Sequence, residues 1–133
     1  MLCATPAGAR YSRKSESDIV SLTYASGVLR LVIDTVTLEG QLVSLEVEFD
    51  APRGFRLLDE GDLIRYWETD VFAGGYHVFE ITSGGWRSQE TQFSRMLTVS
   101  DAIGAREWFV ATSNTCVNVL CGEPPRISEG AAG

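Results

Sequence analysis

The chain lacks the long apolar runs that mark membrane-spanning or secreted proteins. Its longest apolar stretches, such as residues 28–33, are broken by arginine or by acids well before the roughly 20 residues that cross a bilayer. Residues 1–14 contain no apolar stretch of the kind found in secretory signals. From these absences we expect a soluble, cytoplasmic protein.

Cysteine and histidine are also scarce. The chain has three cysteines, an odd number, and one histidine. Cys116 and Cys121 have four residues between them in an expected strand, so their side chains should point to opposite faces of a sheet. We therefore expect buried thiols rather than disulfides, and no structural zinc site, because the sequence does not offer four suitable ligands.

Basic residues are outnumbered by acids, with 11 Lys plus Arg against 18 Asp plus Glu and a net charge of -7. A nucleic-acid-binding domain needs a basic face for the phosphates, so this charge balance argues against that class of protein. The same charge would steer the chain toward a basic partner and speed their association. Solubility alone is the alternative explanation of the acidic charge.

The length of 133 residues, of which 44% are hydrophobic, suits one domain with a core of its own. Residues 1–16 mix small and charged residues without periodicity, and residues 122–133 are rich in Pro, Gly and Ala. We expect flexible tails at 1–16 and 122–133 and a single compact domain over 17–121.

Alternation of apolar and polar residues predicts several half-buried strands. Residues 28–36 and 42–49 alternate most clearly, with Leu45 and Val47 facing inward, and Glu39-Gly40 provides a connection for an antiparallel hairpin. Aromatic and β-branched residues predict further strands. These lie at residues 19–24, 76–81, 107–112 and 116–120, with Ser113-Asn114 as the turn between the last two.

Helical patterns are few. Asp59 is a candidate N-cap for a short helix over 60–67, whose inner face would carry Leu63, Ile64 and Trp67. Residues 100–105 form a weak helix or a loop. Because strands outnumber helices, the predicted fold class is α+β, mainly antiparallel β-sheet with one or two short helices.

Three acids at Asp59, Glu60 and Asp62 offer the oxygen ligands of a hard cation or an interacting acid pair. Capping of a helix explains them more simply, because acids in a first turn satisfy unpaired amides and oppose the helix dipole. Their spacing also departs from the calcium-loop pattern. We therefore expect capping and no metal.

His77 is the one side chain expected to titrate near neutral pH, and Glu80 and Glu90 are candidates to orient it as a base. Alternation places His77 and Glu80 on opposite faces of a strand, and no nucleophile motif such as Gly-x-Ser-x-Gly is present. We expect a half-buried or surface histidine, no catalytic residue and no cofactor.

Residues 83–87, Ser-Gly-Gly-Trp-Arg, expose backbone amides that could hold an anion, but no Lys-Ser or Lys-Thr pair of a phosphate-binding loop follows. We expect a turn between strands, with Trp86 and Arg87 at its tip as residue types that anchor interfaces. Trp67 and Trp108 are expected in the core.

The segments 55–67, with Leu-Asp-Glu-Gly-Asp, and 83–86, with Gly-Gly-Trp, resemble small bacterial proteins of uncharacterised function that share this pattern. Residues 107–110 and 116–119 extend the resemblance, which spans about half the chain. Some of these proteins are similar to immunity proteins of contact-dependent or polymorphic toxin systems. The resemblance implies a protein-binding role, and it assigns no chemistry to particular residues.

Two hypotheses follow. The first is a non-catalytic protein-binding domain, such as an immunity-type inhibitor of a bacterial toxin, that docks an acidic face on a basic protein. Its candidate contact residues are Glu46, Glu48, Asp59, Glu60, Asp62, Trp86 and Arg87. The alternative is a small-molecule-binding protein or minor enzyme with a sheet-lined pocket around His77, Glu80 and Gly84-Gly85. A deep pocket holding His77 beside a carboxylate would favour the alternative.

Overall fold

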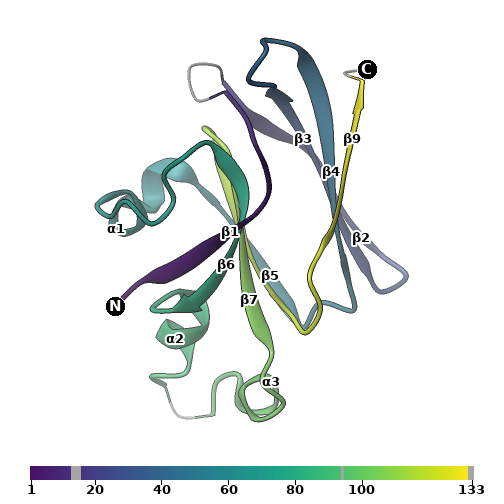
Figure 1. Cartoon of the computed structure of the whole chain (residues 1–133). Coiled ribbons are helices and arrows are strands. Elements are labelled where there is room, and N and C mark those ends of the chain that lie inside the picture. Colours follow the sequence, from purple (N-terminus) through teal and green to yellow (C-terminus); the bar gives the residue numbers. More distant parts are fainter. Residues whose placement is uncertain (13–15, 94, 132–133) are drawn as a thin grey trace.

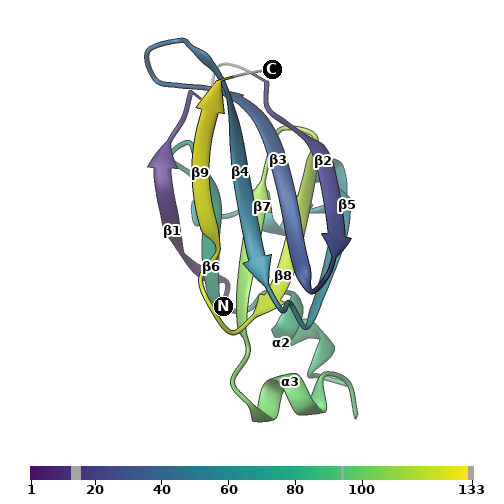
Figure 2. The same ribbon diagram turned by 90° about the vertical axis from the view of Figure 1, so that its right-hand side faces the viewer.

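The computed structural model describes residues 1–12, 16–93 and 95–131, which form two β-sheets packed face to face (Figures 1 and 2). Sheet A contains, in spatial order, β1 (Cys3–Arg10), β6 (Tyr76–Ser83), β7 (Arg106–Ala111), β8 (Thr115–Cys121) and β5 (Gly54–Asp59). Sheet B contains β2 (Asp18–Ala25), β3 (Val28–Val36), β4 (Leu42–Asp50) and β9 (Arg126–Ala131).

All paired strands run antiparallel. The helices are short: a 3₁₀ turn η1 (Glu60–Asp62), α1 (Ile64–Trp67), α2 (Trp86–Glu90) and α3 (Thr98–Ala102). The prediction of a mainly antiparallel sheet with few short helices is confirmed, and the architecture is closer to all-β than to α+β.

The β3–β4 hairpin is the clearest match between pattern and structure. Leu31 pairs with Val47 and Ile33 with Leu45, and all four side chains are buried. Gly40 closes the connection with φ +92, a left-handed backbone that favours glycine. The alternation of apolar and polar residues in the sequence therefore predicted the inward face of both strands correctly.

The main core lies between the two sheets. It joins Leu29, Leu31 and Val47 of sheet B to Trp108 and Val119 of sheet A, together with their neighbours. Such aligned packing of two apolar faces is the standard way for antiparallel sheets to leave water.

The other face of sheet A is covered by α1 and the chain that follows it (Figure 1). Leu63 and Tyr66 point inward, three positions apart, and they pack with Phe72 and Phe109 in a second core. The prediction for the inner face of this helix was wrong at Ile64, which is 65% exposed. A single helical turn has room for one inward pair only, and Leu63 and Tyr66 occupy it.

Each of the two segments expected to be a flexible tail contains a strand. β1 lies within residues 1–16 and pairs with β6, and β9 lies within residues 122–133 and pairs with β4. Both are edge strands, and most of their side chains are exposed or half-buried, so they lack the alternation that marks a strand in sequence. Backbone hydrogen bonds to a neighbouring strand place them instead.

In the part of the chain that the structure describes, no helix has the length and apolar character needed to span a membrane.

Candidate functional site

The acids of β4 face solvent, as alternation predicted, but they lie beside arginines of the same sheet. Glu46 forms an ion pair with Arg30 of β3. Arg126 of β9 pairs with Asp50 and, at 3.4 Å, with Glu48. Two of the candidate contact residues, Glu46 and Glu48, are therefore neutralised within their own sheet.

A second group of acids surrounds η1 and α1. The carboxylate of Asp59 accepts a hydrogen bond from the amide of Gly61 at 2.8 Å, so the predicted cap is confirmed. Besides Asp59, Glu60 and Asp62, this segment carries Glu68 and Asp70. Among the described residues, none of these five acids takes part in an ion pair.

The base within this segment forms no ion pair with these acids among the described residues. Arg65 lies in the middle of the same segment, and its guanidinium donates to the backbone oxygen of Gly84. The segment 59–70 therefore carries five acids against one base, with no ion pair among the described residues, whereas the acids of β4 lie beside arginines.

Trp67 lies in this acidic segment, next to Glu68, and is 37% exposed. The prediction of a core position was wrong for Trp67 and right for Trp108, which is 3% exposed. The indole nitrogen of Trp67 donates to the backbone oxygen of Glu60 at 2.7 Å, and its ring contacts Phe72 and Phe109. The tryptophan is thus held in one orientation while part of its ring faces solvent.

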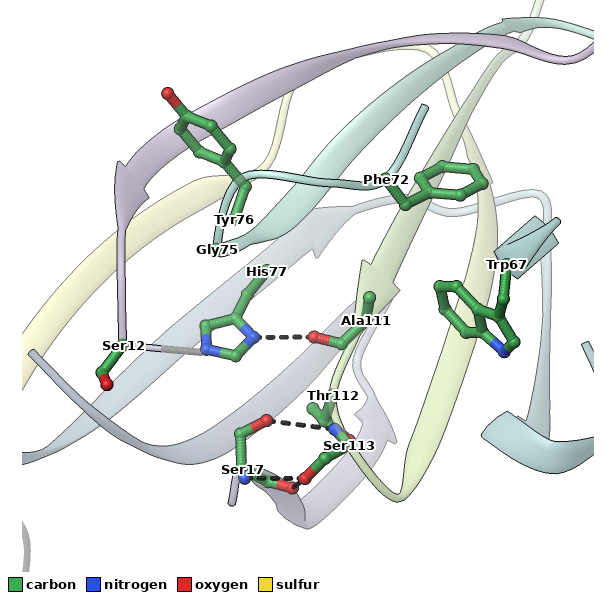
Figure 3. A pocket seen from close by; sticks show the side chains of 10 residues that line it. All are labelled: Ser12, Ser17, Trp67, Phe72, Gly75, Tyr76, His77, Ala111, Thr112 and Ser113. Atoms are coloured by element: carbon green, nitrogen blue, oxygen red, sulfur yellow. Dashed lines mark hydrogen bonds between the residues drawn. The ribbon is translucent and has the colours of Figure 1, made fainter. Parts of the chain in front are cut away.

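Two hollows adjoin Trp67 and share Phe72 as a second wall. The first, of about 190 Å³, is shown in Figure 3 and lies between the start of β6 and the end of β7. The second, of about 240 Å³, is lined by Trp67, Thr69, Asp70, Phe72 and Ala73. Ile64, beside Trp67 in the same helix, adds exposed apolar surface to this region.

His77 lines the first hollow, but both nitrogens of its ring are occupied. Nδ1 lies 2.7 Å from the oxygen of Ala111, which can only accept, so Nδ1 is the donor. Nε2 lies 2.7 Å from Oγ1 of Thr35 in sheet B. Burial lowers the pKa of His77, although the bond to Ala111 acts in the opposite sense, and the neutral ring is favoured.

The predicted partner of His77 is elsewhere. Glu80 accepts two hydrogen bonds from Arg106 at 2.8 Å, and these bonds lower the pKa of Glu80. His77 itself is buried rather than half-buried or at the surface. The structure therefore does not bring together the histidine and carboxylate that an acid–base site in this pocket would need.

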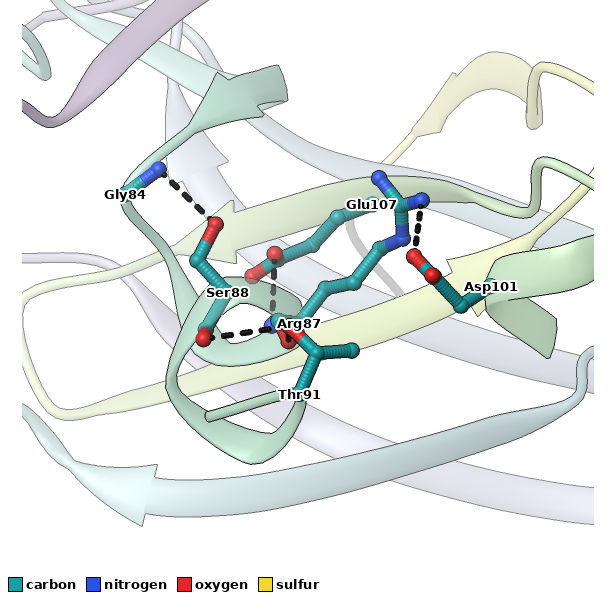
Figure 4. A network of polar contacts seen from close by, with 6 residues as sticks. All are labelled: Gly84, Arg87, Ser88, Thr91, Asp101 and Glu107. Atoms are coloured by element: carbon teal, nitrogen blue, oxygen red, sulfur yellow. Dashed lines mark hydrogen bonds and ion pairs between the residues drawn. The ribbon is translucent and has the colours of Figure 1, made fainter. Parts of the chain in front are cut away.

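The Gly84-Gly85 segment begins helix α2 rather than a simple turn between strands. The carboxylate of Glu107 on β7 accepts hydrogen bonds from the amides of Trp86 and Arg87, both at 2.9 Å (Figure 4 shows the bond to Arg87). Burial raises the pKa of Glu107, and these bonds partly oppose that shift. Sequence reasoning missed Glu107, because a carboxylate inside a strand gives no sign of capping a distant helix.

Trp86 and Arg87 are not presented at a loop tip. The Trp86 ring is half-buried, and the guanidinium of Arg56 lies 5.5 Å from its centre. Arg87 is held by an ion pair with Asp101 at 2.6 Å (Figure 4). Both side chains are committed to contacts inside the protein.

A further apolar surface was also missed. The segment containing α2 and α3 projects beyond one end of the sandwich (Figure 2), and its large apolar side chains face solvent. These are Phe93, Met96, Val99 and Ile103. They are three or four positions apart, which is the spacing of one helical face, but only Val99 of the four lies in a helix, α3.

The thiols behave as expected, since Cys116 and Cys121 are buried, unpaired and on opposite faces of β8. Burial raises the pKa of Cys116 to about 11, which keeps it as an unreactive thiol at neutral pH. Within the described ranges, no three His, Cys, Asp or Glu side chains are grouped so as to hold a metal ion.

Comparison of the chain with models of known protein families, with curated proteins and with solved structures finds no match. The resemblance to immunity proteins therefore stays a prediction.

Proposed function

We propose that the protein is a non-catalytic binding domain that docks on a basic protein through one surface, the Trp67 face. This face consists of Asp59, Glu60, Asp62, Ile64, Trp67, Glu68 and Asp70. The observation that carries the proposal is a segment with five acids that form no ion pair with any described residue and with a fixed, partly exposed tryptophan.

Charge and apolar surface have complementary roles on this face. Acids that lack an internal partner add to the long-range field and steer a basic protein toward the surface, which raises the association rate. Tryptophan is the residue type most often found at the energetic centre of an interface. Because the bond to Glu60 already fixes Trp67, little side-chain freedom is lost when a partner covers it.

The acids of β4 are weaker candidates for the same role. A basic partner would have to displace Arg30 from Glu46 and Arg126 from Glu48 before it gained a new ion pair there. Exchange of one arginine for another yields little net free energy at an exposed site.

The alternative, an enzyme or small-molecule site around His77, has less support. Both ring nitrogens of His77 are occupied, and the buried carboxylate of Glu107 already accepts from two amides and from the amide group of Asn118. An immunity-type inhibitor of a bacterial toxin, acting in the cytoplasm, is one protein of the proposed kind. The resemblance over residues 55–119 is what supports that finer proposal.

The test compares two fluorescein-labelled mixtures of nonapeptides, one with Lys or Arg at alternate positions and one with Glu or Asp there. Binding is measured by fluorescence anisotropy at low and high salt. Matched variants each remove two charges: Glu60→Gln/Glu68→Gln on the Trp67 face and Glu46→Gln/Glu48→Gln on β4.

We expect the basic mixture to bind, to weaken with salt, and to bind at least about fivefold less tightly to the Glu60→Gln/Glu68→Gln variant. The β4 variant should bind like the unmodified protein. Equal binding of the basic and acidic mixtures, or equal effects of the two variants, would overturn the proposal.

A further inference from the structure

We infer that the two hollows beside Trp67 receive two different side chains of one partner segment, a cationic one against Asp70 and an uncharged apolar one against His77. This inference rests on the proposed function and adds the side-chain chemistry that the Trp67 face selects. The observation behind the inference is that the two hollows share Trp67 and Phe72 but differ in their other lining residues: Asp70 lines one and His77 the other.

The hollow at residues 69–73 suits a cation. It combines the ring of Trp67 with Asp70, whose carboxylate has no ion pair among the described residues. A guanidinium or ammonium group placed there gains both a charge-assisted hydrogen bond and a cation–π contact. Glu68, two residues before Asp70, adds to the attraction.

The hollow at His77 suits an uncharged group. Its lining combines three aromatic rings, Trp67, Phe72 and Tyr76, with uncharged polar side chains, and within the described residues no Asp, Glu, Lys or Arg lines it. His77 favours its neutral form, as shown above, so a cation there would lose its hydration with no counter-charge in return.

The polar groups at the base of this hollow are already used. Ser17 and Ser113 bond to each other, with the Ser17 amide donating to Oγ of Ser113 and that hydroxyl donating back to the Ser17 oxygen, both at 2.8 Å (Figure 3). Thr112 and His77 are likewise hydrogen-bonded within the protein. Of the described lining residues, Ser12 and Tyr76 keep hydroxyls at the edge that form no such bond, and an apolar side chain needs none.

The volume of the hollow at His77 suits a single side chain. Sites for drug-sized ligands and cofactors measure about 300–1,000 Å³. A cavity of about 150 Å³ already accommodates a benzene ring. The hollow of about 190 Å³ at His77 therefore has the size of one aromatic or branched aliphatic side chain.

The experiment uses two blocked amino acids as probes, N-acetyl-arginine amide and N-acetyl-phenylalanine amide, titrated at millimolar concentration and followed by NMR. His77 is the one histidine, so its ring proton is a unique reporter of the first hollow. The indole proton of Trp67 reports both hollows, and those of Trp86 and Trp108 serve as internal controls.

We expect the arginine probe to shift the Trp67 signal and leave His77 unchanged, and the phenylalanine probe to shift both. Asp70→Asn should abolish the response to the arginine probe only. Ser12→Phe, which places a ring at the edge of the first hollow, should abolish the response to the phenylalanine probe only, with an unchanged melting temperature in both variants.

A phenylalanine probe that leaves His77 unmoved, or an arginine response that survives Asp70→Asn, overturns the inference. Either result would still allow the Trp67 face to bind basic peptides in a salt-dependent way, without side chains of the peptide entering the two hollows. Loss of peptide selectivity would instead refute the proposed function, so the two failures are distinguishable.

Discussion

The carboxylate of Glu107 lies so close to Gly85 that a Cβ atom added to this glycine would come within 2.7 Å of Oε2. The same carboxylate accepts the amides of Trp86 and Arg87, the first two residues of α2. Position 85 therefore needs a residue without a Cβ atom, because only then can the carboxylate of Glu107, from β7, reach the start of α2.

Gly85→Ala should lower the free energy of unfolding by about 1–3 kcal/mol, since the new methyl group also meets Ile81 at 2.8 Å and forces the carboxylate away from its amides. Urea unfolding measures the change. Gly122→Ala is the matched control, because a Cβ there meets nothing within 4 Å. Equal effects of the two substitutions would show that the contact with Glu107 does not constrain the glycine.

Val47→Asp and Leu45→Asp should each prevent folding, because a buried, unpaired charge costs several kcal/mol against a total stability of about 5–15 kcal/mol. Val47 is fully buried and Leu45 nearly so. The control on the same strand is Leu42→Asp, at a position that is 71% exposed, and it should melt like the unmodified protein. A cooperative thermal transition in Val47→Asp, followed by circular dichroism, would contradict the packing of β4.

Asp59→Ala should lower the free energy of unfolding by about 1 kcal/mol through loss of the bond to the Gly61 amide. Asp62→Ala, in the same turn but without a hydrogen bond in the structure described, should have a smaller effect. Calcium, magnesium or zinc should leave the melting temperature of the unmodified protein unchanged, as expected for a capping acid. A metal-dependent rise that Asp59→Ala abolishes would identify a cation site instead.

Acidification should destabilise the protein through His77. Burial holds the pKa of this ring below its usual 6.5, so below that pH the unfolded chain binds a proton that the folded protein resists. Stability is therefore lost as pH falls from 6.5 toward the folded pKa, by up to about 1.4 kcal/mol per pH unit.

The measurement is urea unfolding between pH 8 and pH 5 for the unmodified protein and for His77→Gln. The raised pKa of Glu107 acts in the opposite sense, since its folded state holds the proton more tightly. Comparison with His77→Gln removes that contribution, because both proteins contain Glu107. Parallel pH profiles would show that His77 is not the group responsible.

The sequence predicted the strands that bury one face and expose the other. β3 and β4 were found because Leu31, Ile33, Leu45 and Val47 follow the period of two. β1 and β9 were missed because their position depends on backbone bonds to distant strands, and edge strands need no alternating pattern.

For the candidate site, local chemistry was predictable and long-range contacts were not. The cap at Asp59 was predicted, since it involves a residue two positions away. The capping of α2 by Glu107 and the bond from Thr35 to His77 join residues far apart in sequence. Trp67 is exposed because the single turn of α1 buries Leu63 and Tyr66 instead. The apolar pattern predicted Leu63 correctly but favoured Ile64 and Trp67 over Tyr66.

The first and last strands of the chain meet along one side of the sandwich (Figure 2). The hydroxyl of Tyr11, just after β1, donates to Glu129 of β9 at 2.7 Å, and Gly8 packs close to Ile127. Joining these strands requires closure of a loop that spans most of the polypeptide, and its entropy must be lost before the contacts form. We therefore expect this seam to close late during folding, on a scale of about milliseconds to seconds, as for other sandwiches of high contact order.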